Sequence, residues 1–542
     1  MVAVALGCRI VTGTGPHGKR LQSVRRAATP QPLSTRLRSP IMAYCARKKF
    51  SERLGCWPEA GRALAWAGIL AWGLGGCVRP GPDSPSPSPV PPASNVPLRL
   101  LVVGDPAMAQ AVEQLRNEWQ AQAGTPLEVA HTGQLDLNAA QGPDAHVLIV
   151  SSALLPDLAV RQWIVPMPSP TGAGHDAEKA GDAPDVFPFL RAREVVWADA
   201  TVAVPFGSAV LTLYYRADLL ERLKLRPPRT WPEYTRIAAL LADRSALAAA
   251  GVPATSPWYP TVEPLGPGWA GVVLMARAAP YVAHRANYST FFHIDTMRPL
   301  VDGPPFVRPL EELIAAVGPN GQELLRFDPA QARHAFWSGH CGMAVTWPSA
   351  THPASAPSNP NLRAAIAELP GSSEVFNIGS RNWEPRTPGE DPHVALVGIA
   401  GRLGVVTSQC PAPDAGFRLL QWLSGEPWDR QVCPVSPETT LFRRSHMRSP
   451  QAWTEAQLPA AIATQYALLV QRAFTQQQWL FALRIPGRSE YLAALDQAVH
   501  EAVRGQQTPR EALQNAAKRW QEITTRLGLD RQRDAYRRGL GL

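Results

Sequence analysis

Histidine and cysteine side chains are the groups in this chain that could bind a metal or act as nucleophiles. His340 and Cys341 are sequence neighbours, so a strand would point their side chains to opposite faces. The pairs His284/His293 and His334/His340 lack the cysteine or carboxylate pattern of a structural metal site. The sequence also contains no GxSxG, no HExxH and no Walker A motif. We therefore expect no catalytic residue, no metal and no cofactor.

Polar side chains follow two predicted buried strands. The runs 98–104 (LRLLVVG) and 144–152 (DAHVLIVSS) are rich in Leu and Val, as buried strands are. Asp105 follows the first run, and Ser151 and Ser152 end the second. Ligands of open α/β sheets gather beyond the carboxyl ends of the strands, which makes these three residues candidates for ligand binding. Asp105 could instead cap the helix that follows it.

Cys77 has a thiol that fits lipid attachment. It follows the apolar run 63–76 (ALAWAGILAWGLGG), which comes after the basic segment 47–53 (RKKFSER). Fourteen residues are too few to span a bilayer, which needs about 20 in a helix, so residues 1–76 are predicted to be a signal peptide. Leu74-Gly75-Gly76-Cys77 resembles the bacterial lipobox. Cys77 would then carry diacylglycerol and become the first residue of the mature protein.

A tether follows the predicted anchor. Eight of the eighteen residues from Pro80 to Pro97 are proline, and such a segment stays extended and unpacked. We expect residues 77–97 to link a lipid-anchored cysteine to a folded body. The leader is long for a signal peptide, and a start at Met42 would leave 35 residues before Cys77. That length favours Met42 as the true translation start.

The charge of the chain is unevenly distributed. The 542 residues carry a formal charge of +9. Residues 1–76 hold twelve Lys and Arg against two acids, which leaves 41 against 42 in the remainder. Because nucleic-acid binding needs positive charge on the folded body, we expect no nucleic-acid partner. Cys341, Cys410 and Cys433 lie in that body, and Cys410 could bridge to Cys433 or remain free.

The mature chain alternates predicted strands and helices. A helix should end at Gly124, strands are expected at 127–132 (LEVAHT) and 394–406 (VALVGIAGRLGVV), and Pro205-Phe206-Gly207-Ser208 should form a bend between TVAV and AVLTLYY. Thr230 and Glu233 have the spacing of a capping box before a helix that buries Ile237, Leu240 and Leu241. Asp328-Pro329 and Thr508-Pro509 should each begin a further helix. This pattern is typical of an α/β protein.

Three segments resemble one protein family. The first is VPFGSAVLTLYYRADLLERLKLRPPRTWPEY (204–234), and the second is FWSGHCGMAVTWP (336–348), in which His340 and Cys341 stand where small or basic residues are usual. The third is the tail, where Pro486, Tyr491 and Gly505 follow in family order. These segments resemble the extracellular solute-binding proteins of ABC importers, in particular the maltose-binding-like group of sugar-binding proteins. The resemblance runs from about Leu98 to about Leu527.

The resemblance implies a two-lobed periplasmic-binding-protein fold of the α/β class, with hinge crossovers and a ligand cleft between the lobes. Lobe 1 would contain residues 98–206 plus 362–425, and lobe 2 residues 207–361 plus 426–542. A sugar cleft needs aromatic faces for the pyranose ring and polar groups for its hydroxyls. Besides the strand-end residues, the expected ligand-binding residues are therefore Phe206, Trp258, Tyr259, Trp269, Trp347, Trp383 and Tyr491. Trp119, Trp422 and Trp520 lie on helical stripes and are expected in the core.

The expected function is that of a lipoprotein that captures a small solute, a sugar by resemblance, and delivers it to ABC permease subunits. The protein would be a monomer in the periplasm or at the cell surface, attached to the membrane through Cys77. Two alternatives stay open: an envelope hydrolase, which the missing motifs disfavour, and a sensor or scaffold that keeps the same fold without transport.

Overall fold

The structure is a computed structural model that describes residues 96–168, 185–249, 257–353 and 362–542. All of them belong to one compact unit, Pro89–Leu542. The predicted signal peptide, the lipidation site Cys77 and most of the tether lie outside the described residues. Among the described helices, we find none with the length and hydropathy that a bilayer crossing requires.

A five-stranded sheet contains the strands predicted at the start of the mature chain. Its order is β2-β1-β3-β14-β6. The first three strands are parallel, and β14 runs antiparallel to both of its neighbours. The strands are β1 (Leu98–Val103), β2 (Leu127–Thr132), β3 (Val147–Ser151), β6 (Val204–Ser208) and β14 (Gly401–Val406). The strand predicted at 98–104 is confirmed. A strand also forms at 127–132, but it was expected to be buried and is largely exposed because it lies at the edge of the sheet. Two strands form within 394–406 as predicted, of which β14 joins this sheet and β13 (Ala395–Val397) pairs elsewhere.

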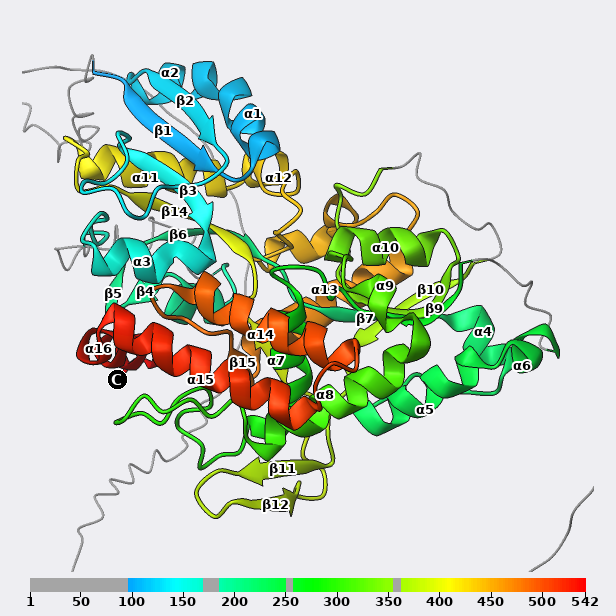
Figure 1. The fold of residues 1–542 in the computed structure, drawn as a ribbon. Coiled ribbons are helices and arrows are strands. Elements are labelled where there is room, and N and C mark those ends of the chain that lie inside the picture. Colours follow the sequence, from blue (N-terminus) through cyan, green and yellow to red (C-terminus); the bar gives the residue numbers. More distant parts are fainter. Residues whose placement is uncertain (1–95, 169–184, 250–256, 354–361) are drawn as a thin grey trace, which may run out of the picture. The chain divides into compact units, whose positions relative to one another are not determined.

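Helices cover both faces of this sheet (Figure 1). Helices α1 (Pro106–Gln114), α2 (Arg116–Ala123) and α11 (Pro413–Ser424) pack with one face. Helix α3 (Leu155–Val160) packs with the other face. Helix α2 ends at Gly124, whose φ of 67° is readily adopted by glycine, as predicted.

A second sheet has the order β10-β7-β9-β8. Its strands are β7 (Thr212–Arg216), β8 (Tyr259–Val262), β9 (Cys341–Thr346) and β10 (Ala364–Glu368). Strand β7 is antiparallel to β9 and β10, whereas β8 is parallel to β9. Helices α5 (Trp231–Ala242), α10 (Pro329–Trp337) and α13 (Ala460–Thr475) pack against these strands.

The chain passes between the two sheets close to the predicted crossover, but not as a bend at 205–208. Those residues belong to β6, which pairs with β14. Strand β7 begins at Thr212 in the other sheet, so the crossover occupies 209–211. Residues 364–368, expected in lobe 1, pair with β7 in the second sheet because their antiparallel register joins Ala364 to Arg216. The division into lobes otherwise stays a prediction.

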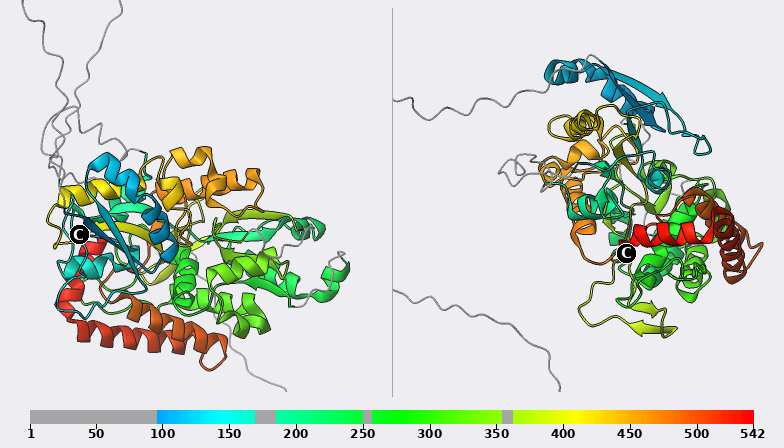
Figure 2. Two further views of the ribbon diagram at one scale, coloured as in Figure 1. Left: turned by 90° about the horizontal axis from the view of Figure 1, so that it is seen from above. Right: turned by 90° about the vertical axis from the view of Figure 1, so that its left-hand side faces the viewer.

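The other elements complete both faces and the C-terminal region. The helices α14 (Arg488–Val503) and α15 (Pro509–Leu527) lie side by side, and Figure 2 shows the same arrangement from two further directions. The remaining helices are α4 (Ala217–Arg222), α6 (Arg244–Ala249), α7 (Ala270–Val282), α8 (Pro304–Val317), α9 (Gly321–Leu324), α12 (Asp429–Val432) and α16 (Leu529–Leu540). Three further pairs of strands are β4 (Val196–Trp197) with β5 (Ala200–Thr201), β11 (Glu374–Asn377) with β12 (Asn382–Pro385), and β13 (Ala395–Val397) with β15 (Trp479–Phe481). A π-helix spans Leu190–Glu194, and 3₁₀ turns span Ser152–Leu154, Gly318–Asn320, Ser445–Arg448 and Pro450–Trp453.

Helix α5 begins after Thr230 as predicted, but only one of the two hydrogen bonds of the predicted capping box forms. Thr230 accepts a hydrogen bond from the Glu233 backbone, but the Glu233 carboxylate accepts from Arg229 instead of Thr230. A complete capping box exists at Thr508 and Glu511. Leu240, expected in the core, is 42% exposed because it lies on the outer side of α5. Cys341, Cys410 and Cys433 are buried free thiols, so the possible Cys410–Cys433 bridge is not formed.

Candidate functional site

The topology of the first sheet brings together residues from distant parts of the chain. Asp105 follows the carboxyl end of β1, and Ser152 follows the carboxyl end of β3. Because β14 runs antiparallel, its first residues lie beside those ends, with Arg402 opposite Ser151. The edge predicted to bind ligand therefore gains a buried arginine that the sequence analysis did not select.

Arg402 is the centre of this edge. Its side chain is 4% exposed, and its guanidinium donates to the backbone oxygens of Val103 at 2.9 Å and Gly104 at 3.3 Å. Its Nε lies 3.3 Å from Asp105 Oδ2, and its second terminal nitrogen lies 3.4 Å from Glu438 Oε2. Asp105 also accepts from the Met108 backbone, so it caps α1, as foreseen, and pairs with Arg402 as well.

A second arginine, Arg488, interacts with the charges of both Glu438 and Glu194. Arg488 is 5% exposed and donates to the backbone oxygen of Ile399. Burial lowers its pKa to about 10, although Glu438 and Glu194 partly offset this effect. Burial also raises the pKa of Glu438, against the attraction of Arg402. Glu194 accepts a hydrogen bond from Ser208 at 2.8 Å, and its burial raises its pKa to about 7.

Six residues share one property and form what we call the polar cluster: Asp105, Ser152, Glu194, Arg402, Glu438 and Arg488. Each has a buried side-chain atom without a hydrogen-bond partner among the described residues. Three of these atoms are carboxylate oxygens, two are guanidinium Nε–H donors and one is a hydroxyl. Three of the six atoms are nevertheless in ion pairs, because Arg402 Nε lies beside Asp105 Oδ2 and another Arg402 nitrogen lies beside Glu438 Oε2. The atoms of Ser152, Glu194 and Arg488 have neither kind of partner among the described residues. Buried polar atoms are normally paired, so these three are available to a ligand.

The space within the polar cluster is small. Ser152, Glu194 and Arg488 line a cavity of about 10 Å³ together with the segment 481–484. That volume holds about one water molecule. A larger ligand can enter only if the surrounding elements move apart.

Two predicted aromatic residues lie next to the polar cluster. The rings of Trp269 and Trp347 are 5.4 Å apart at an angle of 45°. Trp347 Nε1 donates to the backbone oxygen of Pro437, the residue before Glu438. Trp269 is half-buried, whereas Trp347 is 2% exposed. Trp269 therefore offers ring surface to a ligand, and Trp347 ties the pair to the residue that precedes Glu438.

The structure places the other predicted residues away from these contacts. Trp258 is 6% exposed and donates to the Leu241 backbone in the core beside α5. Tyr259 donates to Glu323 at 2.5 Å, and Tyr491 shares a hydrogen bond with Thr524. These contacts suit packing roles, and no ligand role is shown for any of the three.

Phe206, Ser151 and Trp383 also differ in environment. Phe206 is fully buried in the main core, and the Ser151 hydroxyl accepts from the Ala153 backbone. Trp383 lies in β12, where it contacts Tyr281 and Phe376. Of the ten predicted ligand residues, Asp105 and Ser152 belong to the polar cluster and Trp269 and Trp347 lie beside it. Trp119 and Trp520 are buried as expected, and Trp422 is partly buried.

Four residues of the polar cluster were missed. Arg402 and Arg488 had a usable signal, because a single arginine opens the apolar run GRLGVV and another follows Ile485-Pro486-Gly487 at a helix start. An isolated charge beside buried strands must be paired or functional. Glu194 and Glu438 lie in segments without regular apolar spacing, and only the fold brings them to the site.

One group has the composition of a metal site. Glu368, Asp391 and His393 each offer a ligand atom within 4.8 Å of the others. Arg472 forms ion pairs with both carboxylates, so the negative charge of this group is already compensated. We assign no metal to it.

Comparison with known proteins identifies the family. The family model of the bacterial extracellular solute-binding proteins matches residues 118–429, more than half of the chain. The chain belongs to this family of solute-binding proteins. The family is extracellular, which implies a periplasmic or cell-surface location. No curated protein sequence matches the chain.

Solved structures support the same fold. Maltose-bound MalE3 of T. maritima has a TM-score of 0.55 and 17% identity, with 79% of this chain and 100% of that chain covered. A solute-binding protein of an ABC transporter from Agrobacterium radiobacter K84, in complex with ribitol, has a TM-score of 0.55, 19% identity and coverage of 80% and 100%. One from Agrobacterium vitis S4, with bound D-mannitol, has a TM-score of 0.53, 16% identity and coverage of 80% and 99%. The predicted fold class, that of the two-lobed periplasmic binding proteins, is confirmed.

Proposed function

We propose that this solute-binding protein captures a sugar or a sugar alcohol at the polar cluster and delivers it to an ABC permease. The supporting observation is the mixture of buried groups in the polar cluster that have no partner among the described residues: the Ser152 hydroxyl, a Glu194 carboxylate oxygen and the Arg488 Nε–H. A hydroxyl group donates and accepts, so a polyhydroxylated ligand can satisfy carboxylate oxygens and guanidinium N–H groups together. A purely anionic or cationic ligand would leave one kind of atom unpaired.

The aromatic pair supports the same class of ligand. The apolar face of a sugar ring packs on aromatic rings, and Trp269 and Trp347 lie next to the cluster. The solved structures with the same fold contain maltose, ribitol and D-mannitol. We propose capture without covalent chemistry as the role of this site.

We further propose that the ligand enters between the two sheets, with hinges at the crossover 209–211 and in the chain between β10 and β14. Lobe 1 would then contain the five-stranded sheet and lobe 2 the four-stranded sheet. The cavity of about 10 Å³ would widen when the lobes separate.

A ligand panel tests the proposed solute class. We expect maltose, ribitol or D-mannitol to raise the melting temperature of the chain from Ser94 onward, since a ligand that binds only the folded state stabilises it. The solute released from the protein after binding should be chemically unchanged. A response to amino acids, metals or glycerophosphodiesters, with none to sugars or polyols, would contradict the carbohydrate assignment.

A matched pair of variants tests the location. Glu438→Gln should weaken binding of the responding solute at least tenfold, because one hydroxyl then loses a charged acceptor. Glu426→Gln is the control, since its side chain is 58% exposed and pairs with Arg430 at a position outside the polar cluster. Equal affinities for both variants would place the solute elsewhere.

We also propose that the protein is a monomer anchored through a lipid on Cys77. The lipobox-like sequence and the proline-rich tether support the anchor. Cys77→Ser should abolish incorporation of labelled fatty acid while export continues. Unchanged labelling in this variant would rule out Cys77 as the attachment site.

A further inference from the structure

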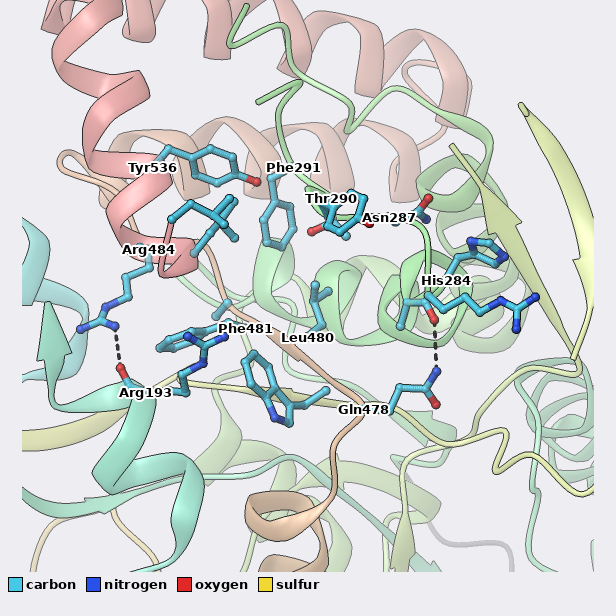
Figure 3. Close-up of a pocket in the computed structure, with 18 of the residues that line it drawn as sticks. Arg193, His284, Asn287, Thr290, Phe291, Gln478, Leu480, Phe481, Arg484 and Tyr536 are labelled. Carbon is cyan, nitrogen blue, oxygen red and sulfur yellow. Dashed lines mark hydrogen bonds between the residues drawn. The ribbon is translucent and has the colours of Figure 1, made fainter. Parts of the chain in front are cut away.

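A larger cavity lies on the other side of the segment that borders the polar cluster. Its volume is about 330 Å³. The loop 283–291, strand β15 and the end of α16 line it, together with Arg193 of the π-helix (Figure 3). Phe481, Ala482 and Arg484 line both this cavity and the small one beside Ser152. We call the larger space the arginine pocket.

The arginine pocket carries positive charge without a matching carboxylate side chain. Arg193, Arg285 and Arg484 line it, and no Asp or Glu does. Among the described residues, Arg193 and Arg285 form no ion pair, whereas the charge of Arg484 is attracted by Glu194. Arg193 and Arg285 are exposed, which leaves their guanidinium groups able to meet a ligand.

Arg484 gives the pocket a fixed inner charge. Its guanidinium donates to the backbone oxygens of Arg193 at 2.7 Å and Glu194 at 3.0 Å. It also lies over the rings of Trp197 and Phe481. The bond to Arg193 is visible in Figure 3 and holds the backbone of that residue at the edge of the pocket.

The remaining wall is largely aromatic. Phe291, Trp479, Phe481 and Tyr536 contribute rings, and Leu480 adds an aliphatic surface. Gln478 donates to the backbone of Ala283, which ties β15 to the opposite loop and keeps the two walls together. An apolar cavity of this size with a few charged groups in its wall has the features of a small-molecule site.

We propose that the arginine pocket is a second ligand site for a small organic anion with an aromatic or apolar body. The aromatic wall would bury the body, and the exposed guanidinium group of Arg193 or of Arg285 would pair with the carboxylate. Arg193 and Glu194 are neighbours that line different cavities, so this site is separate from the polar cluster. The proposal does not depend on the solute bound there.

Two compounds of the same shape test the charge requirement. Titration calorimetry would use the full chain, produced without export, with 1-naphthaleneacetate and its neutral analogue 1-naphthaleneacetamide. We expect the carboxylate to bind at least tenfold more tightly than the amide. Equal affinities, or no binding of the carboxylate at millimolar concentration, would overturn the proposal.

Variants test the position. The double variant Arg193→Gln and Arg285→Gln should lose at least tenfold in affinity for 1-naphthaleneacetate, and Arg285→Gln alone should lose less. Arg510→Gln is the matched control, because this exposed arginine lies outside the pocket. Glu438→Gln should also leave the affinity unchanged. An unaffected double variant, or a loss with Glu438→Gln, would move the compound out of the arginine pocket; melting curves confirm that each variant is folded.

Discussion

Arg402 joins three parts of the chain through one guanidinium. It bonds to the end of β1, lies beside the carboxylate of Asp105 and reaches Glu438. A lysine has a single ammonium group and cannot hold two backbone oxygens and two carboxylates in the same plane. The arginine therefore fixes the relative positions of the polar groups as well as supplying charge.

We expect Arg402→Lys to reduce the free energy of unfolding by about 2–3 kcal/mol, since charged hydrogen bonds to buried backbone oxygens are lost. Urea denaturation measures this change. Arg430→Lys is the control, because Arg430 forms an exposed pair with Glu426 that contributes less than about 1 kcal/mol. Similar losses in both variants would show that Arg402 has no special structural role.

Glu194 makes the polar cluster sensitive to pH. Its pKa is raised by burial to about 7, above the value of about 4.5 of a free glutamate. Between these values the folded state binds more protons than the unfolded state, so stability falls as pH rises from about 4.5 to 7. Above pH 7 the whole cost of ionising this buried carboxyl is present.

Glu194→Gln should remove this dependence. We expect the variant to match the original chain near pH 5 and to exceed its stability at pH 8 by up to about 3 kcal/mol. The Ser208 bond can persist, because an amide oxygen also accepts. The difference between the two unfolding curves, measured from pH 5 to 8, cancels the other titrating groups. A constant difference across this range would contradict the raised pKa.

At the scale of elements, Gly207 allows β6 to end close to another segment. Its φ is +108°, and an added Cβ would lie 2.7 Å from the backbone oxygen of Thr440. A side chain here would be strained by the backbone and would collide with an atom that cannot rotate away. This glycine lies just before the crossover at 209–211.

Gly207→Ala should therefore lower the free energy of unfolding by about 2 kcal/mol or more. The strained backbone conformation supplies part of this loss, and the collision of the new Cβ adds to it. Gly133→Ala provides the comparison, because no atom lies within 4 Å of its added Cβ. Thermal unfolding of both variants measures the effect. Equal melting temperatures would mean that the crossover adapts to a larger residue.

The elements of the first sheet could be predicted because their sequences are locally decisive. Strands β1 and β3 are largely apolar runs, and the capping box at Thr508 marks the start of α15. The membership of β10 could not be predicted, because either sheet accepts a short apolar strand and only long-range register decides. Phe206 was expected to bind ligand as an aromatic residue in a bend, yet it lies within a paired strand that buries its ring.

In the candidate site too, residues marked by local sequence features could be predicted, and residues brought in by the fold could not. Asp105 and Ser152 follow directly from strand ends, which are visible in the sequence. Trp258 was misleading because a Pro-containing loop looks exposed, whereas its indole bonds to Leu241 in the core. Glu194 and Glu438 are separated by more than 240 residues and approach the same arginine only through the fold.

At the scale of the whole molecule, the chain changes sheets within a few residues. Strand β6 ends at Ser208, and β7 begins at Thr212. Short crossovers of this kind are suited to hinge motion, in which a few residues absorb the change in backbone angles. The polar cluster lies beside this crossover, because Ser208 bonds to Glu194. Motion at the crossover would therefore act directly on the ligand-binding groups.

The small cavity within the polar cluster predicts such a motion. A space of about 10 Å³ holds roughly one water molecule, far less than a sugar. The solute-free protein in solution should therefore populate a more open arrangement, which closes when the solute joins the two sheets. Small-angle X-ray scattering of the chain from Ser94 onward should show a smaller radius of gyration after the responding solute is added. Glu438→Gln, at the same solute concentration, should show a smaller decrease. Calorimetric binding without any change in the radius of gyration would mean that the ligand enters without separation of the lobes.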